Sequence, residues 1–273
     1  MKCCYQLGLA VCLLVGSQAG ALETAKSPSG ALDLSHWKLT LPVNASGTTG
    51  GKAAEIPAAQ LAAGYTNPAY FHTKTDGAMV FWCPVNGATT EGTGFPRCEL
   101  REMLDPADDA VNWTAHGTHT LEARCRVTQV PNSQKVIIGQ IHSYSGKAKP
   151  LVKLQFFKGR VEALVKERPR KGKDIKLTFP EVGLDKDFDY EIKVQDGLLK
   201  VTVNGTTQTE NIFQNDADWA NQTFYFKASA YCQDNEGPGS EGARVSFPEL
   251  KVTHSPSLAR SANHAGSPGR TAE

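Results

Sequence analysis

Short runs of alternating apolar and polar residues recur along most of the chain. The runs are rich in β-branched and aromatic side chains, which is typical of β-strands. The sequence predicts strands at residues 36–43, 77–85, 95–102, 118–127, 135–143, 151–157, 159–167, 189–195, 198–205, 223–231 and 243–252. Asp196-Gly197 separates two of these runs and predicts a tight hairpin turn.

Helical patterns are scarce by comparison. Only residues 55–65 and 215–222 favour a helix, each of one or two turns. So many short strands without an internal repeat predict an all-β fold. We expect a two-sheet antiparallel β-sandwich of the jelly-roll, concanavalin-like type, with a substrate groove on one sheet. No linker-like break interrupts residues 31–254, so these residues are predicted to form one domain.

The two ends of the chain have a different composition. Lys2, the apolar run 7–15 and the small residues up to Ala21 predict a signal peptide at residues 1–21. The apolar run is too short to span a membrane. Residues 22–30 are expected to be a flexible lead-in, and residues 255–273 a disordered tail. A secreted or periplasmic protein is therefore expected.

Charge narrows the possible partners. The chain has 273 residues, of which 21% are charged, and its formal net charge is +1. A chain so close to neutral has no global field that would favour nucleic acid or a membrane surface. An anionic partner would have to be bound by a local cluster of cations.

Four cysteines follow the predicted signal peptide: Cys83, Cys98, Cys125 and Cys232. An exported protein can form disulfides, and these four permit three complete pairings between which the sequence does not choose. Small buried apolar side chains are an equally good interpretation. Their spacing does not match a zinc site.

Three predicted strands each carry an unusual polar face, because side chains alternate between the two faces of a strand. The faces are Arg97, Glu99 and Arg101; Gln140 and His142; and Tyr225, Lys227, Ser229, Tyr231 and Gln233. Taken singly, these faces fit a solvated charge ladder, a structural histidine and a polar rim. On one sheet they would form a groove that holds a carboxylate and moves a proton. Glu99 would then hold the two guanidiniums in fixed positions.

These strands resemble the alginate lyases of polysaccharide lyase family seven. Three motifs mark that family: R-x-E-L-R, Q-(I/V)-H and Y-F-K-A-G-x-Y-x-Q. Here they stand as RCELR at 97–101, QIH at 140–142 and YFKASAYCQ at 225–233. The resemblance covers residues 32–254. Cys98 departs from the usual Ser or Thr but faces away from the groove, and Ser229 replaces a Gly where it could narrow a subsite.

The resemblance implies an enzyme that cleaves the 1,4-bonds of alginate by β-elimination, leaving a 4,5-unsaturated uronate. Arg97 and Gln140 would stabilise charge on the substrate carboxylate. Tyr231 would protonate the leaving oxygen, and the C5 proton would go to Tyr231 or to His142. Substrate-positioning roles are implied for Glu99, Arg101, Lys227 and Gln233. In that family, an Ile in the middle of the Q-x-H motif accompanies action on guluronate-containing chains. The resemblance therefore favours guluronate-containing chains as the substrate.

The same resemblance implies no cofactor and no metal. The expected partner is an anionic polysaccharide, alginate, and the expected state is a monomer. The basic run at 166–173 could contact a polyanion, although a solvated hairpin loop is the favoured interpretation.

Two other functions compete. A glycoside hydrolase needs two carboxylates facing one cleft, but Glu102 is predicted to point away from the face that carries Glu99. A non-catalytic polyuronate-binding module would explain groove cations and phenols. It would not need Gln140, His142 and Tyr231 together.

Overall fold

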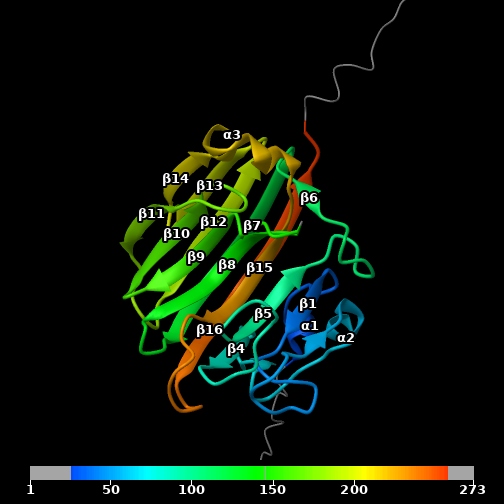
Figure 1. The fold of residues 1–273 in the computed structure, drawn as a ribbon. Helices are drawn as coiled ribbons and strands as arrows, with labels where there is room; N and C mark the ends of the chain where they lie inside the picture. The colour runs from blue at the N-terminus through cyan, green and yellow to red at the C-terminus, as the bar shows by residue number, and fades with distance from the viewer. Residues whose placement is uncertain (1–25, 145, 258–273) are drawn as a thin grey trace, which may run out of the picture.

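The computed structural model describes residues 26–144 and 146–257. The predicted signal peptide and nearly all of the predicted tail lie outside these residues. The described chain forms two stacked antiparallel sheets, which confirms the predicted β-sandwich (Figure 1).

The first sheet has nine strands. Its main path, in spatial order, is β11 (Asp174–Glu181), β10 (Arg160–Lys166), β9 (Val152–Phe157), β8 (Lys135–Ser143), β15 (Thr223–Cys232), β5 (Arg97–Glu102), β1 (Trp37–Thr40) and β2 (Glu55–Ile56). The short strand β6 (Trp113–Thr114) pairs with β15 at the side of this path. All three motifs therefore lie on adjacent central strands, β8, β15 and β5.

The second sheet has seven strands and lies behind the first. Its order is β14 (Thr206–Asn211), β13 (Leu198–Val203), β12 (Asp187–Gln195), β7 (Thr118–Gln129), β16 (Gly242–Ser255), β4 (Met79–Pro84) and β3 (Phe71–Thr73). The predicted hairpin is β12–β13. Its turn residues Asp196 and Gly197 have φ of 45° and 82°, as a type I′ turn requires.

Helices are few and short, as predicted. They are α1 (Pro28–Ala31), α2 (Ala58–Ala62), α3 (Ile212–Asn215) and the 3₁₀ helix η1 (Ala217–Asn221). Helix α1 occupies residues expected in the flexible lead-in, and its Pro28 is buried. The predicted lead-in is thus ordered at its C-terminal end.

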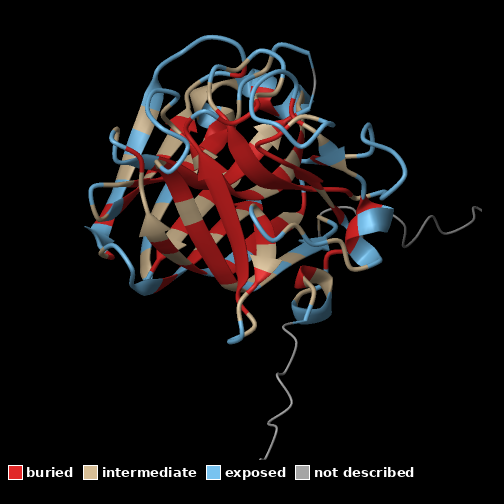
Figure 2. Ribbon diagram, turned by 90° about the horizontal axis from the view of Figure 1, so that it is seen from below, coloured by how far each residue is buried: buried red, intermediate tan, exposed pale blue. Residues whose placement is uncertain are grey.

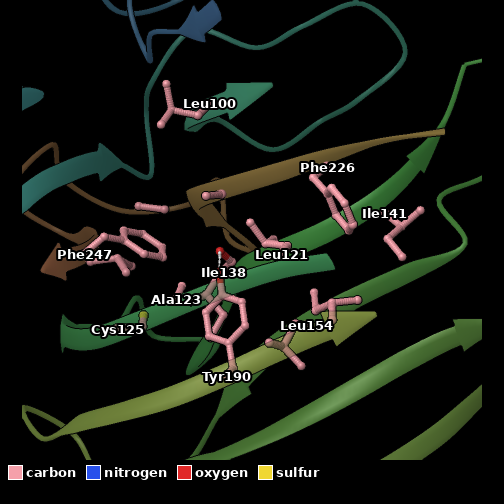
Figure 3. Packing of buried hydrophobic residues seen from close by; sticks show 14 of the residues in the cluster. Leu100, Leu121, Ala123, Cys125, Ile138, Ile141, Leu154, Tyr190, Phe226 and Phe247 are labelled. Carbon is pink, nitrogen blue, oxygen red and sulfur yellow. Dashed lines mark hydrogen bonds between the residues drawn. The ribbon is translucent and has the colours of Figure 1, made fainter. Parts of the chain in front are cut away.

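The core fills the space between the sheets. Figure 2 shows the buried strands at the centre of the molecule, with most exposed segments in loops around them. Figure 3 shows side chains from both sheets packed together, among them Leu121, Ile138 and Phe226. Gly139 on β8 illustrates how close the sheets lie, because a Cβ there would come within 3.0 Å of the Tyr190 hydroxyl oxygen.

The four cysteines of the described chain, Cys83, Cys98, Cys125 and Cys232, are all free and buried. Burial raises the pKa of Cys83, Cys98 and Cys125 well above that of an ordinary thiol. They act as small core residues, which was one of the two interpretations that the sequence left open. None of the described helices is long and apolar enough to cross a bilayer.

Candidate active site

A groove of about 680 Å³ crosses the outer face of the first sheet. Five of the predicted site residues line it: Arg97, Gln140, His142, Tyr231 and Gln233. They come from β5, β8, β15 and the residue after β15, which pairing places side by side. The structure therefore brings the predicted catalytic residues to one groove.

Glu99 is the centre of a buried charged cluster at this groove. Its side chain is 1% exposed. Oε1 accepts hydrogen bonds from Arg97 Nη1 at 3.1 Å and from Lys227 Nζ at 2.6 Å. Oε2 accepts one from Gln140 Nε2 at 2.7 Å. We call Glu99, Arg97, Lys227 and Gln140 the Glu99 cluster.

Two cations keep this carboxylate ionised. Burial alone would raise the pKa of Glu99, but Lys227 and Arg97 lower it to about 2. Burial also lowers the pKa of Lys227, an effect that Glu99 opposes. Glu99 thus fixes the cations and the Gln140 amide. An amide NH₂ has two hydrogens, so Gln140 keeps one donor beyond its bond to Glu99.

His142 follows Gln140 on the same face of β8. Its Nδ1 lies 2.7 Å from the carbonyl oxygen of Ser143 and donates to it in the neutral ring, which leaves Nε2 as the acceptor. The imidazole stacks on the Tyr225 ring with centroids 5.3 Å apart. Burial lowers the pKa of His142 to about 3, and the positive charge of Lys227 contributes to the same shift. His142 is therefore neutral near pH 7 and able to accept a proton.

The phenol ring of Tyr231 packs on the guanidinium of Arg97. The centre of the guanidinium lies 3.8 Å from the centroid of the phenol ring, within the range of a cation–π contact. Arg97 also donates through Nη2 to Thr93 Oγ1 at 3.0 Å. The guanidinium is thus held on three sides, by Glu99, Thr93 and Tyr231, and it fixes the phenol at the wall of the groove.

Arg101 has different partners from those expected. Glu99 binds Arg97 and Lys227, so the expectation that it holds two guanidiniums is wrong. Arg101 donates to the Asp109 carbonyl at 2.8 Å and to Asn112 Oδ1 at 3.0 Å. Its guanidinium centre lies 4.1 Å from the centroid of the Tyr225 ring. Arg101 therefore anchors the loop before β6, beside the groove lining rather than in it.

Ser229 does not narrow the groove. It is fully buried, and its Oγ donates to the Ile137 carbonyl at 2.8 Å. The register of β15 against β8 shifts between Ala228 and Tyr231, which marks a β-bulge or irregularity. The hydroxyl satisfies a carbonyl at this irregularity. The sequence could not reveal this irregularity, because the prediction assumed that side chains alternate strictly between the two faces of the strand.

Sequence reasoning missed several residues that position the predicted ones. Thr93, Asp109 and Asn112 lie in loops, where strand periodicity gives no signal. Tyr225 shares the polar face of β15 but was not included among the predicted site residues. Within residues 26–144 and 146–257, no group of three or more His, Cys, Asp or Glu side chains is arranged to hold a metal ion.

The model of one protein family, described as alginate lyase, matches residues 32–254. This chain belongs to the alginate lyases. An alginate lyase of Klebsiella pneumoniae is 30% identical over 285 residues, covering 84% of this chain and 91% of that protein. The family match spans the predicted domain and all three motif strands.

Solved structures of alginate lyases support the same family assignment. Alginate lyase A1-II′, a member of polysaccharide lyase family 7, is 42% identical with a TM-score of 0.78, covering 85% of this chain and 100% of that one. An alginate lyase from Pseudomonas aeruginosa is also 42% identical, with a TM-score of 0.73 and coverage of 82% and 100%. The chain is thus a polysaccharide lyase of family 7. The predicted family is confirmed.

Proposed function

We propose that this alginate lyase cleaves the 1,4-bonds of alginate by β-elimination, with a preference for guluronate-containing chains. The observation that carries the proposal is the groove itself. It combines a neutral imidazole, a phenol and fixed charge-stabilising donors on three adjacent strands. A variant of the A1-II′ lyase has been solved in complex with substrate, and it is 41% identical to this chain with a TM-score of 0.79.

The reaction needs charge stabilisation first. The C5 hydrogen of a uronate lies next to a carboxylate and becomes acidic only when developing negative charge on that group is stabilised. Arg97 supplies a permanent cation, and Gln140 supplies its remaining amide hydrogen. Because Glu99 fixes both groups, they do not have to reorganise when charge develops.

Proton transfer follows. His142 Nε2 accepts the C5 proton of a guluronate. A mannuronate presents that proton on the opposite face, where Tyr231 in its phenolate form accepts it and then passes it to the leaving oxygen. The electrons of the C5–H bond form the C4–C5 double bond as the bond from C4 to the glycosidic oxygen breaks. Tyr231 donates its proton to that oxygen. The products are a free hydroxyl end and a 4,5-unsaturated uronate.

The competing functions fit the site less well. Glu102, the nearest carboxylate along β5, accepts from Trp113 Nε1 at 3.0 Å and from the Phe226 amide at 2.8 Å. Its other oxygen lies 2.5 Å from His254 Nε2 on the second sheet. It therefore offers Glu99 no same-face partner for glycoside hydrolysis. A binding module would not need a proton acceptor and a phenol in the groove.

Two further properties belong to this proposal. The apolar run near the N-terminus supports export, to the medium or the periplasm. We also propose that the enzyme acts as a monomer.

Ultraviolet absorbance tests the reaction, because the new double bond is conjugated to a carboxylate and absorbs where the substrate does not. The protein is incubated with polyguluronate, polymannuronate and mixed alginate. Absorbance should rise fastest with polyguluronate. A faster rise with polymannuronate would overturn the proposed preference for guluronate. New reducing ends without a rise in absorbance would show that the enzyme hydrolyses the bond and does not cleave it by elimination.

A further inference from the structure

Tyr225 contacts the candidate base without lining the groove. On β15 it is paired directly with His142 on β8. The two rings are stacked, with their planes 14° apart. The Tyr225 hydroxyl oxygen lies 3.2 Å from His142 Nδ1. In the part of the chain that the structure describes, His142 lines the groove and Tyr225 does not. A substrate in the groove would therefore meet the imidazole, and the phenol would act on it only through His142.

Two oxygens face the Nδ1 atom of His142. The carbonyl oxygen of Ser143, at 2.7 Å, can only accept, so Nδ1 carries the hydrogen of the neutral ring. The phenol oxygen of Tyr225 is a second acceptor for the same hydrogen. Burial raises the pKa of Tyr225, so the phenol itself stays neutral near pH 7. With its hydrogen fixed on Nδ1, the imidazole keeps Nε2 bare, as a proton acceptor requires.

Tyr225 is itself held by a residue of the strand on its other side. Strands β8 and β5 flank β15 in the first sheet, and they carry His142 and Arg101 respectively. The Arg101 guanidinium centre lies 4.1 Å from the centroid of the phenol ring, within the range of a cation–π contact. The Tyr225 ring therefore has one contact from each neighbouring strand, which restricts its rotation.

The loop before β6 fixes Arg101 in turn. Arg101 Nη2 donates to the Asp109 carbonyl at 2.8 Å and to Asn112 Oδ1 at 3.0 Å. Asn112 Nδ2 donates to the same Asp109 carbonyl at 2.8 Å, so the loop and the guanidinium are bound as one unit. Direct contacts thus run from this loop through Arg101 and Tyr225 to His142. This series of contacts gives Arg101 a role although it does not line the groove.

We propose that Tyr225 is a positioning residue that fixes the orientation and tautomer of His142, and so sets how fast guluronate is cleaved relative to mannuronate. The inference rests on the proposed function, in which His142 takes the C5 proton from guluronate alone. Without Tyr225, the imidazole can turn or move its hydrogen to Nε2, and the base is lost. Tyr231 keeps its own contact with Arg97, so cleavage of mannuronate is spared.

The test compares the wild type with Tyr225→Phe and Tyr225→Leu on polyguluronate and polymannuronate. Phe keeps the stacked ring and removes the oxygen, whereas Leu removes both. On polyguluronate, kcat should fall about 10-fold in the Phe variant and about 100-fold in the Leu variant, because a small displacement of a reacting group costs rate of this order. KM, and kcat on polymannuronate, should change far less. Tyr70→Phe, which removes the hydroxyl of a half-buried phenol before β3, should behave as wild type.

Nitrogen NMR of the His142 ring gives a second readout, independent of activity. The wild type should show the tautomer with hydrogen on Nδ1, and Tyr225→Leu should show a mixture of both tautomers. If the Leu variant does not fold, the same comparison is made with Tyr225→Phe.

An unchanged tautomer, or equal losses of kcat on the two substrates, would overturn the inference. A changed tautomer in the variant, beside a wild type that forms no unsaturated product, would support the positioning of His142 and refute the lyase reaction.

Discussion

At the scale of single residues, the Glu99 carboxylate determines the charge of the groove. It is fully buried yet ionised, because Arg97 and Lys227 bind one oxygen and Gln140 the other. The sequence predicted that Glu99 would hold cations, since charges alternate along β5. It named Arg97 correctly but expected Arg101 where the structure has Lys227, because Lys227 reaches Glu99 from a strand far away in the chain.

Replacing Glu99 by Gln should destabilise the protein by about 3–5 kcal/mol, because two buried cations lose their counter-charge. The measurement is the free energy of unfolding in urea. Glu249→Gln is the matched control: Glu249 is 71% exposed and lies 3.8 Å from Arg124, so its loss should cost less than about 0.5 kcal/mol. Similar costs for the two variants would refute the central role of Glu99.

His142 should stay neutral far into the acid range. Its pKa is lowered to about 3, while an unfolded histidine titrates near pH ~6.5. Between these values the unfolded chain binds a proton that the folded chain does not. The contribution of His142 to stability is therefore complete above pH ~6.5 and is lost as the pH falls toward 3.

An NMR titration checks this directly. The imidazole resonances of His142 should not shift between pH 8 and pH 5, roughly the window in which an ordinary histidine titrates. The exposed His116, in the same spectrum, serves as an internal comparison. A midpoint for His142 near pH ~6.5 would contradict the argument that burial and Lys227 lower its pKa.

At the scale of elements, apolar alternation predicted the central strands well. It missed the edge strands β11 (Asp174–Glu181) and β14 (Thr206–Asn211), which are largely polar because they end the sheets. The irregularity at Ser229 was also hidden, because a period of two assumes a regular strand. Turn chemistry was more informative: Asp196-Gly197 forms the predicted hairpin.

Gly197 and Gly205 form a matched pair for testing the turn. Their φ values are 82° and 80°, so alanine is strained at either position by about 1–2 kcal/mol. A Cβ at Gly197 would also clash with the Phe213 ring, whereas one at Gly205 would meet nothing within 4 Å. Gly197→Ala should therefore cost at least ~1 kcal/mol more than Gly205→Ala. Equal losses in thermal unfolding would refute the close packing of Phe213 on the turn.

At the scale of the whole molecule, the sandwich brings distant motifs together. β5, β15 and β8 are adjacent in the first sheet although residues 97 and 231 are far apart in the chain. The second sheet supports them from behind, where Tyr190 packs on Gly139. Each motif alone had an ordinary explanation, and only their pairing in one sheet makes a groove. The loops that line the groove beside these strands could not be placed from the sequence.

The most direct test of the account is Tyr231→Phe beside the wild type on polyguluronate. Removing one hydroxyl should lower kcat by at least ~100-fold, because proton transfer to the leaving oxygen is lost. Calorimetric affinity for the same substrate should remain close to that of the wild type. Undiminished turnover in the variant would contradict the assignment of Tyr231 as the acid. Equal affinities, with no unsaturated product from either protein, would identify the groove as a binding site without catalysis.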